Sequence, residues 1–358
     1  MKKVVVGMSG GVDSSVTAYL LKKQGYDVIG VTMQIWQDEK RECLEDNGGC
    51  CGFSAVDDAR AVAKKLDIPY YVLNFKKEFK QNVIDYFIDE YTKGNTPNPC
   101  IACNRYVKWE SLLNKSLALG ADYIATGHYA RIVKHPLTCR YTIKTANTDE
   151  KDQTYALYNL TQFQLEKTLM PIGDYDKDTV RKIAKEAGLI VANKPDSQDI
   201  CFVPDGDYAK FIKKNSNVKI KEGNFVDING NVLGKHKGIT NYTIGQRKGL
   251  GIAFGKPMYV CRIDAEKNEV VLTENEGLFK HNVLIKDFNF MSVDDIQGEV
   301  EVLGKLRYSQ KPSPCIIRKT NNNMIEAIFK EPQRAVTPGQ AAVFYDGEYV
   351  LCGGTIYQ

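Results

Sequence analysis

The 358-residue sequence predicts an α/β protein with a doubly wound parallel sheet, followed by a small central domain and a C-terminal β-barrel. Three observations predict this fold class. Strand patterns alternate with helix patterns through the first half, which is typical of a parallel sheet with helices on both faces. A glycine-rich loop joins the first strand to the first helix. From about residue 277 onward, short alternating segments with Gly, Pro and Asn breaks favour a small β-barrel or sandwich.

The elements of the first half follow from apolar periodicity and local breaks. We expect strands at residues 4–6, 28–33, 70–73 and 123–126. We expect helices after Ser14 and Ser54, at 77–91, near 161–170 and near 178–187, and a hairpin around 140–146. Ser14 is a residue type that caps helices, and Ser54 with Asp57 three residues later resembles a capping box.

Length and charge divide the chain further. A chain of this length usually folds as two or three domains. We expect domains at 1–203, 204–276 and 277–358. The net charge of +4 neither demands nor excludes a nucleic-acid partner. Between Asp205 and Lys256, however, ten Lys or Arg residues accompany only four Asp or Glu, a local net charge of +6. This segment fits contacts to phosphates, although a plain solvated surface has the same composition.

The strongest local motif is Ser9-Gly10-Gly11-Val12-Asp13-Ser14. Glycines let backbone N–H groups approach a phosphate closely, and the amino terminus of a helix favours an anion. The serine hydroxyls are further donors, and Asp13 is suited to hold a magnesium ion. No lysine follows, so this is not the Walker loop that grips β- and γ-phosphates. The structural alternative is a glycine turn with a serine cap.

Ligands of parallel sheets bind at the carboxyl ends of the strands. Gly7, Met33 and Gly127 each fall at the end of an expected strand. Met33 alone is equally well explained as a core residue. The motif and these positions together predict a nucleotide site at one edge of the sheet.

Ten cysteines without an export signal favour reduced thiols. Cys100 and Cys103 form a C-x-x-C pair, and Cys201 lies far downstream. Two thiols that meet in the fold can pass sulfur by persulfide exchange and leave a disulfide. Cysteine suits this chemistry because a few per cent of the thiol is ionised near neutral pH. Half a zinc site is the structural alternative, but the sequence lacks a second C-x-x-C pair.

The motif from Ser9 to Ser14 resembles the pyrophosphate loop, or PP-loop, of the ATP-pyrophosphatases, which adenylate an oxygen and release pyrophosphate. With the cysteine segments added, the chain resembles the bacterial tRNA-specific 2-thiouridylases nearly from end to end. The similarity also covers residues 48–51, 127–129, 151–153, 242–251, 307–309 and 337–340.

The resemblance implies roles for particular residues. ATP and Mg²⁺ would be held by Gly7, Met8, Ser9, Gly10, Gly11, Val12, Asp13 and Ser14, with Met33 and Gly127 at the adenine. Cys201 would carry the persulfide and Cys103 would be the nucleophile, joined in a transient disulfide. The target base would lie against Asn98, Pro99 and Cys100. Contacts to tRNA would come from His128, Lys151, Asp152, Gln153, Arg307, Tyr308 and Gln340.

The implied reaction is ATP-dependent 2-thiolation of the wobble uridine in tRNAs for lysine, glutamate and glutamine, with release of AMP and pyrophosphate. A cysteine desulfurase or a sulfur-relay protein would load the persulfide. The sequence leaves open whether sulfur reaches carbon 2 as released sulfide or directly from the persulfide. The paired cysteines argue against another adenylating enzyme. The intact loop argues against a non-catalytic RNA-binding protein.

Cys100 departs from the commoner Asn-Pro-Asp pattern of the family, so a carboxylate at this position is not essential here. Cys100 is then a packing residue, an auxiliary thiol, or, with Cys103 and Cys201, a ligand of an iron–sulfur cluster with one open iron. Cys50 and Cys51 are interpreted as structural. The N-terminal apolar run is too short for a signal peptide, and no stretch reaches the ~18 apolar residues of a membrane span. We therefore expect a cytoplasmic monomer without a membrane partner.

Overall fold

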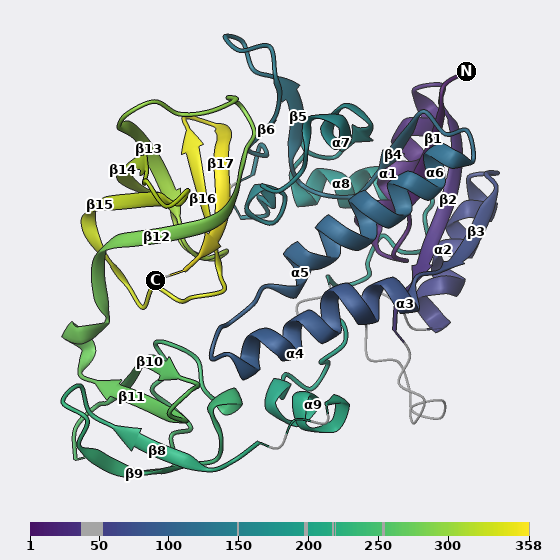
Figure 1. Ribbon diagram of the computed structural model, residues 1–358. Helices are drawn as coiled ribbons and strands as arrows, with labels where there is room; N and C mark the ends of the chain where they lie inside the picture. The colour runs from purple at the N-terminus through teal and green to yellow at the C-terminus, as the bar shows by residue number, and fades with distance from the viewer. Residues whose placement is uncertain are drawn as a thin grey trace.

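A computed structural model describes residues 1–36, 53–148, 150–196, 200–216, 218, 220–252 and 255–357 of the chain. Figure 1 shows a helix-covered sheet at the N-terminal side, a small sheet from the middle of the chain, and a barrel of long strands at the C-terminal side. The predicted fold class is confirmed. No helix within the described ranges is long and apolar enough to cross a membrane.

The first sheet has five parallel strands in the order β3-β2-β1-β4-β7. They are β1 (Lys3–Gly7), β2 (Asp27–Gln34), β3 (Tyr70–Asn74), β4 (Tyr123–Ala125) and β7 (Thr168–Leu169). Side chains alternate between the two faces, so Val4 and Val6 pack into one hydrophobic cluster while Val5 packs into another. The central strand β1 is buried on both faces, which explains its continuous apolar run, whereas β3 at the edge of the sheet is partly exposed. The four predicted strands are confirmed, and β7 is too short to give a sequence signal.

Helices cover both faces of this sheet. The cluster around Val4 is completed by α1 (Val12–Lys23), α2 (Phe53–Lys65) and α8 (Lys177–Glu186). On the other face, α3 (Lys76–Phe79), η1 (Lys80–Ile84) and α4 (Asp85–Thr92) form one continuous helical rod with a π-helical insert. The predicted helices at 77–91 and 178–187 are therefore confirmed.

A second continuous rod consists of α5 (Pro99–Ala102), η2 (Cys103–Leu112) and α6 (Leu113–Ala118). We call this rod, residues 99–118, the cysteine helix. Figure 1 shows it running from the parallel sheet toward the barrel, beside α4. Its middle part is π-helical, a form that often occurs at functional sites.

Two capping predictions were wrong, and one predicted helix is present but shorter than expected. Ser14 lies inside α1, whose N-cap is Gly11, because the Ser14 hydroxyl is bonded within the glycine-rich loop. Ser54 lies inside α2 rather than before it. The helix expected at 161–170 is α7 (Gln162–Glu166), which begins with a capping box at Thr161 and ends where the chain enters β7.

The hairpin is longer than predicted and connects two parts of the molecule. It is formed by β5 (Arg131–Lys134) and β6 (Tyr141–Lys144) rather than by residues 140–146. Tyr349 of the C-terminal barrel pairs with Lys144 of β6. The first sheet region and the barrel are thus joined by backbone pairing.

The middle of the chain forms α9 (Tyr208–Asn215) and a four-stranded sheet in the order β10-β11-β8-β9. The strands are β8 (Gly223–Val226), β9 (Val232–His236), β10 (Tyr259–Asp264) and β11 (Glu269–Thr273). Short 3₁₀ turns are η3 (Thr154–Ala156), η4 (Ile239–Asn241) and η5 (Asn275–Leu278). Phe225 and Tyr242 belong to the small hydrophobic core of this sheet.

The C-terminal strands close into a barrel in the order β12-β15-β14-β13-β16-β17, and β12 pairs again with β17. They are β12 (Phe279–Phe290), β13 (Val300–Lys305), β14 (Ser313–Lys319), β15 (Ile325–Arg334), β16 (Ala341–Asp346) and β17 (Tyr349–Ile356). Because the last pairing closes the sheet, these strands leave no open edge to one another. The predicted C-terminal β-barrel is confirmed.

Candidate active site

The glycine-rich loop leaves the carboxyl end of β1 and turns directly into α1. Gly10 has a φ of +70°, and a Cβ at this position would lie 2.3 Å from the carbonyl oxygen of Ala55. A Cβ on Gly127 would lie 2.7 Å from the backbone nitrogen of Ser14. Only glycine fits at these two positions, so the loop lies directly against α2 and the segment that follows β4.

The two serine side chains of the loop are bonded within it. Ser9 donates its backbone N–H to the Ser14 hydroxyl at 3.1 Å, and that hydroxyl donates to the carbonyl of Gly11 at 3.2 Å. The two hydroxyl oxygens lie 3.3 Å apart. A phosphate bound here would compete with these bonds. Met33 lies near the end of the neighbouring strand β2, half-buried against the hydrophobic core.

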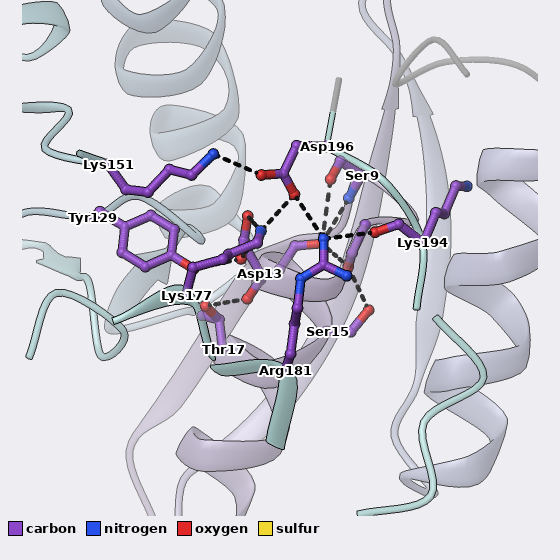
Figure 2. Close-up of polar contacts among 12 residues, drawn as sticks. Ser9, Asp13, Ser15, Thr17, Tyr129, Lys151, Lys177, Arg181, Lys194 and Asp196 are labelled. Atoms are coloured by element: carbon purple, nitrogen blue, oxygen red, sulfur yellow. Dashed lines mark hydrogen bonds and ion pairs between the residues drawn. The ribbon is translucent and has the colours of Figure 1, made fainter. Parts of the chain in front are cut away.

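The carboxylate of Asp13 is held by two side chains from outside the loop. The hydroxyl of Tyr129 donates to Oδ1 at 2.7 Å. The ammonium of Lys177 donates to Oδ1 at 2.8 Å and to Oδ2 at 2.9 Å. Lys177 is only 13% exposed, and its ammonium also pairs with Asp196 at 2.6 Å. Lys177 therefore bridges the loop to the segment that leads to Cys201 (Figure 2).

Asp196 also interacts with two further basic side chains near the loop. Lys151 donates to it at 2.9 Å, and Arg181 lies 3.7 Å away. Burial raises the pKa of Asp196, but the hydrogen bonds from Lys177 and Lys151 outweigh burial and leave this pKa below its ordinary value. The bond to Asp196 also raises the pKa of Lys151. Three cations thus surround two carboxylates, which favours an additional anion.

Asp13 has the chemistry expected of a magnesium ligand. Its oxygens face a cation, the ammonium of Lys177. Magnesium in nucleotide sites is commonly held by one or two carboxylates together with substrate phosphates and water. A Mg²⁺ that arrives with ATP therefore fits at Asp13 if Lys177 gives up its place there.

The cysteine helix begins with a capped turn. Asn98 accepts the backbone N–H groups of Cys100 at 3.1 Å and Ile101 at 3.3 Å, and Pro99 occupies the first helical turn. Cys100 is exposed and Cys103, one turn later, is half-buried. The cap fixes the position of both thiols at the end of the helix.

The segment around Cys201 is anchored by its neighbour. Phe202 is buried and lies in ring contact with Phe79, Phe87 and Phe211, at centroid distances of 5.7, 5.4 and 5.1 Å. Cys201 itself is exposed. Cys103 packs against the same hydrophobic cluster. Cys103 and the neighbour of Cys201 therefore meet in one cluster, although they are far apart in sequence.

We next consider metal binding by the cysteines that the structure describes. Within the described ranges, no group of three or more His, Cys, Asp or Glu residues is placed to hold a metal ion. The iron–sulfur cluster at Cys100, Cys103 and Cys201 therefore stays a prediction from the sequence. Cys50 and Cys51 lie outside the described residues.

His128 is a supporting residue in this structure. Its ring lies 5.5 Å from that of Trp109, and its Nδ1 is 2.8 Å from the hydroxyl of Thr126. Lys108 lies 3.4 Å from Nε2. Burial first, and then the charge of Lys108, lower the pKa of His128 well below its ordinary value. A neutral imidazole here offers hydrogen bonds rather than a charge to a nucleic acid.

The 151–153 segment supports the loop network. Asp152 accepts the backbone N–H groups of Ala146 at 2.9 Å and Thr154 at 3.2 Å. Gln153 accepts the backbone N–H of Tyr129 at 3.0 Å. This bond helps hold Tyr129, whose hydroxyl reaches Asp13.

The barrel contributes three of the sequence-predicted residues. Arg307 donates to the carbonyl oxygens of Arg334, at 3.2 Å, and of Ala335. Gln340 donates to the carbonyl of Thr96 at 2.8 Å, just before the cysteine helix. Tyr308 is 46% exposed.

The surroundings of Tyr308 show where the barrel meets the site. Burial raises the pKa of Tyr308, and the nearby charges of Asp152 and Cys100 raise it further. The positive charge of Lys151 lowers the pKa of Tyr308. The fold thus brings Tyr308, Cys100 and the 151–153 segment into one neighbourhood.

Sequence reasoning missed Tyr129, Lys177 and Arg181. One signal pointed to Lys177. It is the first residue of α8, after the N-cap Asp176, and a cation at a helix amino terminus is disfavoured by the helix dipole. A lysine in such a place needs an anionic partner from elsewhere in the fold. Asp13 and Asp196 are those partners.

Three family models match the chain in succession. Residues 2–205 match a model described as tRNA methyl transferase HUP domain. Residues 209–274 match the tRNA methyl transferase PRC-barrel domain, and residues 280–356 match the aminomethyltransferase beta-barrel domain.

Full-length relatives are closely similar. A tRNA-specific 2-thiouridylase MnmA of Lachnoclostridium phytofermentans is 64% identical over 356 residues, covering 99% of each chain. The protein of the same name from Clostridioides difficile is 61% identical over 99% of this chain and 98% of its own. That of Acetivibrio thermocellus is 59% identical over 99% of each.

Proposed function

The chain belongs to the family of tRNA-specific 2-thiouridylases, and from this premise we propose that it transfers sulfur to a uridine of tRNA with consumption of ATP. The observation that carries the proposal is the glycine-rich loop, whose carboxylate Asp13 faces a cation beside the segment leading to Cys201. In this proposal the loop binds the phosphates of ATP and the cysteines provide the thiol chemistry. Each is needed to replace oxygen by sulfur.

ATP binds with its phosphates at the loop from Gly7 to Ser14 and at the amino terminus of α1, with Met33 and Gly127 beside the adenine. Asp13 would hold Mg²⁺, which would supply positive charge to the phosphates. Lys177, which pairs with Asp13, is placed to neutralise phosphate charge in place of the lysine that the loop motif lacks. Arg181 and Lys151 add to the positive field.

The first chemical step makes the uridine oxygen a leaving group. The 2-oxygen of the base attacks the α-phosphorus of ATP, and the bond to pyrophosphate breaks. The product is an O-adenylated base. Concentrated positive charge at Lys177 and Arg181 favours this step because charge accumulates on the departing pyrophosphate.

The second step delivers sulfur from a persulfide on Cys201. In one route the terminal sulfur attacks carbon 2, AMP leaves, and the Cys103 thiolate then attacks Sγ of Cys201 and frees the thiocarbonyl. In the other, Cys103 attacks first and releases sulfide, which displaces AMP. Both routes reduce the persulfide sulfur by two electrons and leave a Cys103–Cys201 disulfide. A thiol reductant and a sulfur donor, such as a cysteine desulfurase or a relay protein, restore the enzyme.

The substrate is the wobble uridine of the tRNAs for lysine, glutamate and glutamine. Its base lies against Asn98, Pro99 and Cys100 at the start of the cysteine helix. The remaining tRNA contacts come from the barrel and the 127–153 region. These are His128, Lys151, Asp152, Gln153, Arg307, Tyr308 and Gln340. Because His128 is neutral, Arg307 is bonded to backbone carbonyls and Lys151 is paired with Asp196, the exposed Tyr308 is the member best placed to meet RNA.

The family models' descriptions speak of methyl transfer, whereas the relatives' names speak of thiolation. The residues favour sulfur. Methyl transfer has no need of a loop that binds a pyrophosphate, and it leaves the Cys103–Cys201 pair without a role. We therefore propose a tRNA-uridine 2-sulfurtransferase.

The test is thiolation of unmodified tRNA with ATP, Mg²⁺ and a sulfur donor. We expect AMP and pyrophosphate as products, with activity abolished in Cys103→Ser and Cys201→Ser. Cys139→Ser and Cys261→Ser are matched controls and should remain active. Radioactive sulfur should accumulate on Cys201 when a donor is supplied. ADP as product, or full activity of Cys201→Ser, would refute the assignment.

A further inference from the structure

A cavity of about 340 Å³ lies between the cysteine helix and the C-terminal barrel. From the cysteine helix and its cap it is lined by Asn98, Ala102 and Arg105. These positions recur at helical spacing and so lie on one face of the helix. The lining residues described include neither Cys100 nor Cys103. The cavity is therefore on a different face of the helix from the two thiols.

The cavity contains a buried side-chain amide whose oxygen accepts no hydrogen bond from the described residues. Asn159 lines it and is only 9% exposed. Its side-chain oxygen has no hydrogen-bond partner among the residues that the structure describes. Such a group costs stability unless something bonds to it. An amide also carries both a donor and an acceptor, so it can pair with a planar ligand edge that does the same.

The barrel holds Asn159 in place. The side-chain amide of Asn289, in β12, donates to the carbonyl of Tyr158 at 2.8 Å and to that of Leu160 at 3.1 Å. These carbonyls flank Asn159 on both sides. The position of the unsatisfied amide is thus fixed by tertiary contacts.

The rest of the lining is aromatic and charged. Tyr86, Tyr106 and Tyr158 contribute rings, and the guanidinium of Arg105 lies 5.1 Å from the ring centre of Tyr106. Asp287 adds a carboxylate to the lining. Neither Arg105 nor Asp287 forms an ion pair within the described part of the chain. Rings and guanidinium planes of this kind are the surfaces on which proteins stack unpaired RNA bases.

The backbone at Asp287 is unusual as well. Its φ is +51°, a left-handed conformation that is uncommon for a residue other than glycine. It lies where the pairing of β12 with β17 shifts register between Lys286 and Asn289. Such bulges often redirect side chains beside functional sites. Here the bulge places the Asp287 carboxylate in the cavity lining.

We propose that this cavity binds the base of the tRNA nucleotide on the 3′ side of the target uridine, and that Asn159 pairs with the edge of that base. The inference rests on the proposed function, because the ligand is part of the same tRNA. Asn98 connects the two sites, since it caps the helix end assigned to the target base and also lines the cavity.

The chemistry of the lining selects uracil. Its N3–H and O4 present a donor next to an acceptor, which matches the acceptor and donor of the Asn159 amide. Codons for lysine, glutamate and glutamine all have adenine in the second position. Their tRNAs therefore share a uridine directly 3′ to the wobble uridine. A pocket that reads this base would select the three proposed substrates together.

The experiment compares anticodon stem-loops with U, C or A at this neighbouring position, and measures both binding without ATP and thiolation with it. We expect wild-type protein to prefer U in both assays. Asn159→Leu should weaken binding of the U stem-loop about tenfold and remove most of the preference, as for other paired base contacts. Arg105→Met, an exposed position, should weaken binding of all three stem-loops. Asn322→Leu, on an exposed turn of the barrel, is the matched control and should change neither.

Stability separates a binding role from a structural one. Because the Asn159 oxygen lacks a partner within the described residues, Asn159→Leu should keep or raise the melting temperature while binding falls. The inference is overturned if wild-type protein binds the three stem-loops equally, or if Asn159→Leu retains the preference. The ATP-free binding assay decides this independently of thiolation. Absence of thiolation by wild-type protein would instead overturn the proposed function.

Discussion

The glycine-rich loop and the cavity beside the barrel differ in whether their buried polar groups have partners within the protein. At the loop, Asp13 and Asp196 are both satisfied by Lys177. In the cavity beside the barrel, Asn159 is buried with an unused oxygen. A ligand at the loop must therefore displace internal bonds, whereas a ligand in the cavity adds bonds that the protein lacks.

The difference has consequences for affinity and stability. Where internal partners must be displaced, the apparent affinity is reduced by the free energy of the bonds given up. Loss of such a partner also leaves an uncompensated charge and destabilises the fold. Where the polar group is unused, its removal affects binding and spares the fold. A substitution at the loop should therefore reduce both function and stability. A substitution of the cavity amide should reduce binding and leave stability unchanged.

Between these two regions, the largest effect is expected from Asp13→Asn. This change removes the carboxylate assigned to Mg²⁺ and leaves Lys177 paired with Asp196. Loss of one positioned electrostatic group in an active site typically costs 10²–10³ in rate, so we expect tRNA-dependent pyrophosphate release to fall about 100-fold or more. Asp178→Asn, on an exposed position of α8, is the control and should retain the wild-type rate. Wild-type pyrophosphate release by Asp13→Asn would remove Asp13 from the mechanism.

Next in size is the effect of Lys177→Met. Asp13 and Asp196 then lose the cation that they share, and both are less than one-third exposed. We expect a loss of about 1–3 kcal/mol in the free energy of unfolding, together with a raised KM for ATP. Chemical denaturation and steady-state kinetics measure the two effects. Lys182→Met, exposed on the same helix, should show neither.

Set beside Asn159→Leu, the Lys177 substitution tests the comparison itself. One variant should be less stable and impaired, the other impaired but no less stable. If both variants lose the same stability, the cavity is an ordinary part of the packed interface.

The sequence predicted the parts of the site that are local in the chain. The loop from Ser9 to Ser14 and the cysteine pair are contiguous motifs, and the β-rich C-terminal pattern indicated the barrel. The partners of Asp13 were missed because Tyr129 and Lys177 are 116 and 164 residues away in sequence. No periodicity links residues so far apart. The unsatisfied Asn159 was equally invisible, since a missing hydrogen bond is a property of the folded surroundings.

Local capping signals failed for a related reason. Ser14 has the side chain of a helix cap, but its hydroxyl is bonded to Ser9 and Gly11 within the loop. The demands of the loop therefore decided where α1 begins. The capping signal at Ser14 correctly predicted that a helix begins in this region, but it placed the first residue of α1 wrongly.

The basic middle segment provides a third case. Lys213 and Lys214 are exposed in the last turn of α9, within the basic middle segment. If they bind tRNA phosphates, replacing both by Glu should weaken tRNA binding at low salt. The slope of log affinity against log salt should then fall by about one for each phosphate that is no longer neutralised. Binding titrations at several salt concentrations measure the slope. An unchanged slope would assign this pair to a solvated surface, and ATP affinity should not change in either case.

The smallest effect is expected from pH. The pKa of Asp196 is below its ordinary value of 3.8 because the bonds from Lys177 and Lys151 outweigh burial. A carboxyl whose pKa is lowered by folding stabilises the protein at pH above the unfolded-state value, and this contribution is lost as pH falls through the folded-state value. The effect is modest because burial opposes the two hydrogen bonds. The stability difference between wild-type protein and Asp196→Asn should therefore be constant near neutral pH and shrink in the acid range below 3.8.

The same titration distinguishes the two regions. Because the Asn159 amide does not ionise, the stability difference between wild-type protein and Asn159→Leu should not vary over this range. Unfolding curves at a series of pH values give both differences in one experiment. A stability difference for Asp196→Asn that persists unchanged into strong acid would show that Asp196 contributes through packing rather than charge. The ion pairs of Asp196 with Lys177 and Lys151 would then not be what stabilises the loop region.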